Sequence, residues 1–111
     1  MKRIYFLAKL DHNYYTHGYT WEHKLTEHLE KLSISFGIRV IAQDYVETHS
    51  VKTLKNHINR ELKAYRVPET TLLHISTPMP ILEIMLQYDG ETIDPTYPPK
   101  PLDYEEPDLN S

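Results

Sequence analysis

Two stretches of the chain place apolar residues at every third or fourth position, which is the spacing of an amphipathic helix. The first stretch, residues 21–36, ends at Gly37, where a helix often closes with a left-handed residue. The second, residues 51–65, follows Ser50, a favoured N-cap residue, and stops before Pro68. We therefore predict two helices. Their apolar stripes are Trp21, Leu25, Leu29, Leu32 and Phe36 in the first and Val51, Leu54, Ile58, Leu62 and Tyr65 in the second.

Three shorter runs, residues 4–8, 38–46 and 70–76, are rich in apolar and β-branched residues and do not alternate. Continuous apolar strands separated by helices are typical of a parallel sheet with helices packed on it. We therefore predict an α/β fold with a small three-stranded, mainly parallel sheet in the order β-α-β-α-β and two or three packed helices. The polar and aromatic residues 11–19 predict a loop, which leads to Thr20 as the N-cap of the first helix.

Residues 78–90 are compatible with two structures. Pro78 at a first helical position and Gly90 beyond the last one favour a third helix. The Asp-Gly pair that ends at this glycine is also a strong turn signal, so a hairpin is the alternative. Five prolines follow residue 94, and they exclude a helix or a central strand there. We predict a single domain over residues 1–90 and an extended, acidic, proline-rich arm over residues 91–111.

The distribution of charge changes close to this boundary between the domain and the arm. Residues 89–111 contain seven acidic residues and one lysine, whereas residues 1–88 contain eleven basic and nine acidic residues. The chain has no cysteine, which excludes disulfides and thiolate metal sites, and its three glycines are too dispersed for a phosphate-binding loop. No apolar run approaches the roughly 18 residues of a membrane span. We expect a cytoplasmic protein with no cofactor, no metal and no membrane contact.

One hypothesis from these residues is enzymatic. Ligands of a parallel sheet bind at the carboxyl ends of its strands, and the first two predicted strands are followed by His12 and His49. Imidazoles act as general acids and bases near neutral pH. The first alternative is therefore a small enzyme or ligand-binding domain in which these two histidines are catalytic.

The leading hypothesis is a small non-enzymatic interaction or regulatory protein, with the size and composition of a prokaryotic or phage accessory protein. Tyrosines are enriched at binding hot spots, and proline-rich segments dock in an extended form at low entropic cost. The partner is a protein or a second copy of the chain. The expected contact residues are Tyr14, Tyr15 and Tyr19 in the loop and Tyr97, Leu102, Tyr104 and Leu109 in the arm.

The second predicted helix supports another alternative, nucleic-acid binding, because clustered cations neutralise phosphates. Its basic face comprises Lys52, Lys55, Arg60, Lys63 and Arg66. The modest positive charge of residues 1–88 is low for a nucleic-acid binder. The acidic arm complements this face, so we also expect the arm to dock on the chain itself, on a second copy or on a basic partner.

Overall fold

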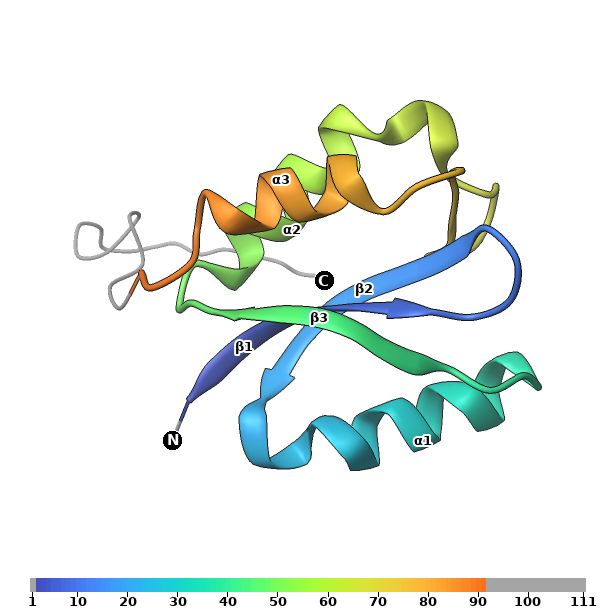
Figure 1. The fold of residues 1–111 in the computed structure, drawn as a ribbon, viewed down its shortest axis with the longest axis horizontal. Coiled ribbons are helices and arrows are strands. Elements are labelled where there is room, and N and C mark those ends of the chain that lie inside the picture. Colours follow the sequence, from blue (N-terminus) through green and yellow to red (C-terminus); the bar gives the residue numbers. More distant parts are fainter. Residues whose placement is uncertain (1, 92–111) are drawn as a thin grey trace.

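The computed structural model describes residues 2–91, which form three layers with a sheet between helices (Figure 1). The strands are β1 (Arg3–Lys9), β2 (Tyr14–Trp21), β3 (Ile41–Glu47) and β4 (Leu73–His74). The helices are α1 (Leu25–Phe36), α2 (Val51–Glu61) and α3 (Met79–Leu86), with single 3₁₀ turns η1 (Glu22–Lys24) and η2 (Lys63–Tyr65). None of the helices in this part of the chain is long and apolar enough to cross a membrane.

The sheet has the order β3-β1-β2-β4, and every neighbouring pair is antiparallel. The prediction of a three-stranded, mainly parallel sheet is therefore wrong. Its error lies in the expected loop at residues 11–19, because most of that segment belongs to β2. This strand pairs with the whole of β1, from Arg3 opposite Trp21 to Lys9 opposite Tyr15. The hairpin reverses the chain before α1, so β3 returns antiparallel to β1.

A tight turn makes this hairpin. The amide of Tyr14 donates to the carbonyl of Asp11, and the amide of Leu10 donates back to the carbonyl of Tyr14. His12 takes a left-handed backbone conformation with φ of 51°. The residues that follow are mainly tyrosine and threonine, which favour strands. Thr20 lies within β2, so it is not the expected N-cap, and α1 begins only after η1.

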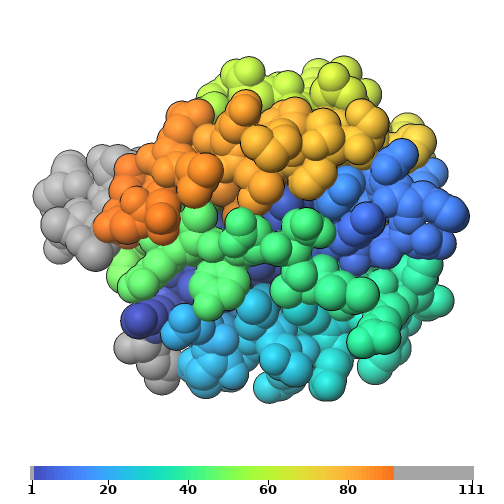
Figure 2. Space-filling view, viewed as in Figure 1, coloured from blue at the N-terminus to red at the C-terminus, as the bar shows by residue number. Residues whose placement is uncertain are grey.

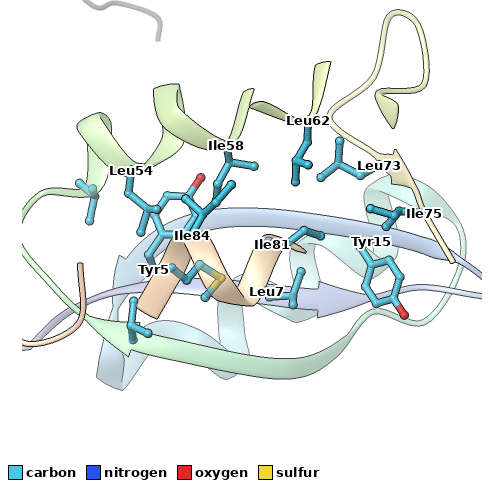
Figure 3. Packing of buried hydrophobic residues seen from close by; sticks show 13 residues of the cluster. Tyr5, Leu7, Tyr15, Leu54, Ile58, Leu62, Leu73, Ile75, Ile81 and Ile84 are labelled. Atoms are coloured by element: carbon cyan, nitrogen blue, oxygen red, sulfur yellow. The ribbon is translucent and has the colours of Figure 1, made fainter. Parts of the chain in front are cut away.

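Alternate residues of β1 serve two separate cores. Phe6 and Ala8 face α1 and pack with Leu29. Tyr5 and Leu7 face the opposite side of the sheet, where α2 and α3 cover them. Figure 3 shows this larger core, in which side chains from β1, α2 and α3 meet above the sheet. A central strand buried on both faces explains why residues 4–8 are continuously apolar.

The helices confirm most of the predicted spacing of apolar residues. Gly37 closes α1 with φ of 70°, and the buried stripe of α2 contains Val51, Leu54 and Ile58, as predicted. Residues 79–86 form a helix, so the hairpin alternative is wrong there. The third predicted strand shrinks to the two residues of β4. The arm residues Tyr97, Leu102, Tyr104 and Leu109 lie outside the described residues.

Candidate functional site

The outer side of β2 is only partly paired. β4 is so short that it pairs with Tyr14 and Tyr15 alone. Within residues 2–91, no strand pairs with this side of residues 16–21. An unpaired strand edge presents backbone donors and acceptors to another segment.

The hydrogen bonds at the two ends of the hairpin show which residues face that edge. The amide of Glu22 donates to the carbonyl of Lys2, and the turn beside Tyr14 continues the same ladder. Bonding residues alternate in an antiparallel pair, so the even-numbered residues of β2 bond to β1. His17 and Tyr19 therefore direct their N–H and C=O groups away from β1, toward the unpaired edge.

A cavity of about 390 Å³ lies along this edge. We call it the β2 groove. Four consecutive residues of β2, with side chains on both faces of the sheet, contribute to it, so it follows the strand edge itself. The lining residues are Thr16, His17, Gly18 and Tyr19 of β2, Phe6 of β1, His28 and Leu32 of α1, Lys55 and Asn59 of α2, and Arg66, Thr71 and Leu73 around β4.

The two walls of the β2 groove differ in chemistry. On the α1 side lie Phe6, Leu32 and His28, whose imidazole contacts the Phe6 ring edge-on at 5.2 Å between centroids. Burial, and then the charge of the nearby Lys31, lower the pKa of His28 and favour its neutral form. This wall is therefore largely uncharged.

The α2 side carries Lys55, Asn59 and Arg66. None of the described residues that line the groove is Asp or Glu. Within the described residues, Lys55 and Arg66 therefore give this wall a positive charge that no carboxylate of the lining offsets. One wall is thus apolar and the other basic, with the strand edge between them.

A turn orients Arg66. Its Nε donates to the carbonyl of Thr70 at 3.0 Å. The Thr70 hydroxyl donates to the carbonyl of Val67 at 2.7 Å and accepts from the amide of Leu72 at 3.1 Å. The guanidinium is therefore held at the groove by a hydrogen-bonded turn, which lowers the entropic cost of binding an anion.

Beneath the edge, the Tyr5 hydroxyl and Nδ1 of His17 lie 2.6 Å apart in a hydrogen bond. Burial, and then the positive charge of Lys55, lower the pKa of His17 to about 4. Burial, and then the neighbouring Tyr19, raise the pKa of Tyr5 well above its usual value. Both partners are neutral at pH 7, so the positive charge of the groove comes from Lys55 and Arg66.

The tyrosines predicted as a binding loop take three different positions. Tyr15 is only 3% exposed and belongs to the core, so it is not available to a partner. Tyr14 stacks on His74 with 4.4 Å between ring centroids. Tyr19 lines the β2 groove, and the guanidinium of Arg3 lies over its ring at 4.9 Å. Of the three, only Tyr19 lies in the groove.

The structure does not bring His12 and His49 together. His12 follows β1 beyond Lys9, whereas His49 follows β3 beyond Glu47, which pairs with Ile4 at the other end of β1. The length of β1 between these ends is roughly 17 Å. The joint catalytic site expected from a parallel sheet is therefore not formed.

His12 lies instead at a separate cavity of about 280 Å³ beside the hairpin turn. Its Nε2 is 3.6 Å from the carboxylate of Asp11, and both side chains are largely exposed. The rest of this cavity is apolar, with Leu10, Tyr14, Phe36, Ile38 and Leu72 in its lining. The cavity lacks the second histidine that the enzymatic hypothesis requires.

Only part of the predicted basic face lies in the β2 groove. Lys55 and Arg66 reach the β2 groove, while Lys52, Arg60 and Lys63 are exposed on the same helix and turn outside its lining. His17 and Asn59 also line the groove, although they were not among the predicted site residues. The groove forms because β2 extends beyond the end of its partner β4. Because residues 11–19 were predicted to be a loop, this strand edge was not expected.

Among residues 2–91, no three histidine, cysteine, aspartate or glutamate side chains lie close enough together to hold a metal ion. No protein-family model, curated protein or solved structure matches the chain.

Proposed function

We propose that this protein is a non-enzymatic binding protein that takes an extended segment of a partner protein into the β2 groove. The segment adds a strand to the sheet beside residues 16–19. The observation that carries this proposal is the outward direction of the backbone groups of His17 and Tyr19 into the groove. Strand addition of this kind gains affinity from main-chain hydrogen bonds and specificity from pockets for alternate side chains.

The two walls define the chemistry of the segment. Successive side chains of a strand point to opposite faces of a sheet. A segment that alternates apolar and acidic residues directs the apolar ones toward Phe6 and Leu32 and the acidic ones toward Lys55 and Arg66. Hydrogen bonds between ionised partners are roughly twice as strong as neutral ones, so the acidic positions contribute most to selection.

Nucleic acid fits these observations less well. Residues 2–91 contain eleven basic and eleven acidic residues, so the described part of the chain has no net positive charge. Nucleic-acid binders usually concentrate a strong positive potential on the surface. A peptide backbone can pair with both the N–H and the C=O groups of the open strand edge, whereas a phosphodiester offers acceptors only.

The test is selection of peptides from a random display library by the full-length protein. The groove variant Lys55→Gln/Arg66→Gln removes one lysine and one arginine from the basic wall. The matched control Lys24→Gln/Arg39→Gln removes the same two residue types from exposed positions outside the groove. Each variant loses two positive charges, so the two variants have the same net charge and differ only in where the charges were removed.

We expect the wild type and the control to enrich peptides with short, proline-free stretches of alternating apolar and acidic residues, and the groove variant to lose them. Equal enrichment by the groove variant, or no enrichment by any of the three proteins, contradicts the proposal. Labelled single-stranded DNA and RNA are tested in parallel at low salt. Binding of these probes that depends on Lys55 and Arg66, without peptide enrichment, assigns the groove to nucleic acid instead.

A further inference from the structure

We infer that residues 102–106 of this chain occupy the β2 groove of their own molecule, as an internal ligand that a partner segment must displace. The inference rests on the proposed function, since it assigns a regulator to the same groove. It is carried by three observations, which are the side-chain pattern of these residues, the point from which the chain leaves α3, and the distribution of charge.

The first observation is that the alternation of apolar and acidic residues in 102–106 matches the apolar and basic walls of the β2 groove. Residues 102–106 read Leu-Asp-Tyr-Glu-Glu and form the longest proline-free stretch beyond residue 91. With Leu102 and Tyr104 on the apolar α1 side, the alternation of a strand places Asp103 and Glu105 on the basic α2 side. Pro101 and Pro107 bound the stretch, and they limit strand pairing to the residues between them.

The second observation is the exit point of the chain. The carbonyl of Glu91 accepts from the amide of His49 at 2.9 Å, and its carboxylate accepts from the Ser50 hydroxyl at 2.7 Å. The amide of Gly90 donates to the carbonyl of Glu47. The chain is therefore fixed beside the start of α2, at the same end of the sheet as Trp21, the last residue of β2.

Distance and direction allow docking within one molecule. The eleven residues from 92 to 102 span up to about 36 Å when extended. The outer edge of β2 lies two strand positions from β3, which is roughly 10 Å. A chain that enters the groove from the end at Trp21 runs antiparallel to β2, as do all neighbouring pairs in the described sheet.

The third observation is charge. Residues 92–111 contain five acidic residues and one lysine, so the net charge of −4 of the whole chain resides there. The groove offers Lys55 and Arg66 with no carboxylate in its described lining. A tethered segment acts at an effective concentration in the range of mM, so even weak contacts compete with a partner.

The test uses the full chain with two of the five acids neutralised. The variant Asp103→Asn/Glu105→Gln removes the charges assigned to the basic wall. The matched control Asp94→Asn/Asp108→Asn removes two charges from the same arm outside residues 102–106. Amide chemical shifts of residues 16–19 are compared by NMR, together with the affinity for a peptide selected as described above.

We expect the first variant to shift the amides of residues 16–19 and to bind the selected peptide about tenfold more tightly, which corresponds to about 1.4 kcal/mol. The control leaves both unchanged. Unchanged groove amides in the first variant overturn the inference, as do equal effects of the two variants. Dependence of the wild-type groove shifts on protein concentration overturns docking within one molecule and indicates a second copy.

The inference and the proposed function fail in different ways. If no segment of the arm occupies the groove, the selected peptide still binds, and the two arm variants bind it equally. If the groove takes no partner segment, no peptide is enriched even by Asp103→Asn/Glu105→Gln, while that variant still alters the groove amides. Each result therefore identifies which of the two statements is wrong.

Discussion

Two strand edges of the described sheet, that of β3 and that of β2 beyond the end of β4, are built differently, although β3 and β2 are of similar length. β3 crosses the surface between α3 and α1, and most of its residues are exposed (Figure 2). The amide of Thr48 donates to the carbonyl of Arg3, so the alternation along β3 turns the amide of Tyr45 outward. That amide donates instead to the carboxylate of its neighbour Asp44 at 2.8 Å. A register shift opposite Leu7 and Ala8 further interrupts this strand.

Among residues 2–91, no side chain accepts from the outward amides of the β2 edge, and no register shift interrupts this strand. Its pairing with β1 is regular throughout, and its outward groups at His17 and Tyr19 open between two helices with cations on one wall. Free edges attract unwanted strands, and proteins protect them with bulges, charges or covering elements. The β3 edge is therefore protected against strand addition, whereas the proposed function requires the β2 edge to accept a segment between α1 and α2.

The largest expected difference between the edges is their response to acid. The pKa of His17 is about 4 in the folded protein, against 6.5 for an unperturbed histidine. The unfolded state therefore binds more protons between these values, so the free energy of unfolding falls as pH drops from about 6.5 to about 4. The contribution is on the order of 3 kcal/mol at most.

Urea unfolding at several pH values checks this against His17→Gln, which lacks the titrating group. We expect the wild type to lose more stability across this window than the variant, and the excess loss to end near pH 4. Both proteins share the same carboxylates, so their titration cancels in the difference. Parallel pH profiles contradict the assignment of this loss to the residue beneath the β2 edge.

Charge reversal on each edge gives the next largest effect. Lys55→Glu places a negative charge on the basic wall of the groove, and we expect the selected peptide to bind about 30-fold more weakly, or about 2 kcal/mol. Asp44→Lys on the β3 edge changes the affinity less than about twofold. Isothermal titration calorimetry measures both. A similar loss from the two substitutions removes the distinction between the edges.

A smaller effect is expected from the turn that holds Arg66. Thr70→Val removes the hydroxyl that links Val67 and Leu72, while the carbonyl that binds Arg66 remains. We expect peptide affinity to fall about threefold because the guanidinium becomes less fixed, which corresponds to about 0.7 kcal/mol. The same titration checks it. An unchanged affinity shows that the turn does not position Arg66 for binding.

The smallest effect concerns the β3 edge alone. Asp44→Val removes the carboxylate that accepts from the Tyr45 amide, and leaves a more apolar edge with an unpaired donor. We expect weak self-association, seen by sedimentation velocity only at high protein concentration. Asp11→Val, which removes an exposed acid from the hairpin turn, is the control and stays monomeric. Self-association of both variants attributes the effect to lost charge rather than to the edge.

The contrast between the helices and the sheet explains what sequence could predict here. α1 and α2 follow from the three-to-four-residue spacing of Leu25, Leu29, Leu54 and Ile58, because each helix buries one stripe. The predicted sheet was wrong because the polar residues of β2, including His17, resemble a loop when the strand that pairs with them is unknown. The signal was its tyrosines and threonines after a turn with Asn13, a combination that favours a hairpin.

The site was predictable only in part for the same reason. The charge count identified Lys55 and Arg66 as members of a basic face, since charges can be read directly from the sequence. Their place beside a strand edge depends on β4 being shorter than β2, which is a property of long-range pairing. The expected histidine pair failed because His12 and His49 follow antiparallel strands, whose ends lie at opposite sides of the sheet.

The most direct test of the open β2 edge is amide hydrogen exchange with and without the selected peptide. The full-length variant Asp103→Asn/Glu105→Gln is used, so that the arm does not compete for the groove. We predict that the peptide slows exchange at His17 and Tyr19, whose amides gain partners, and leaves Tyr45 and Glu47 on the β3 edge unchanged. Unchanged exchange at His17 and Tyr19, or equal slowing at Tyr45 and Glu47, would contradict it.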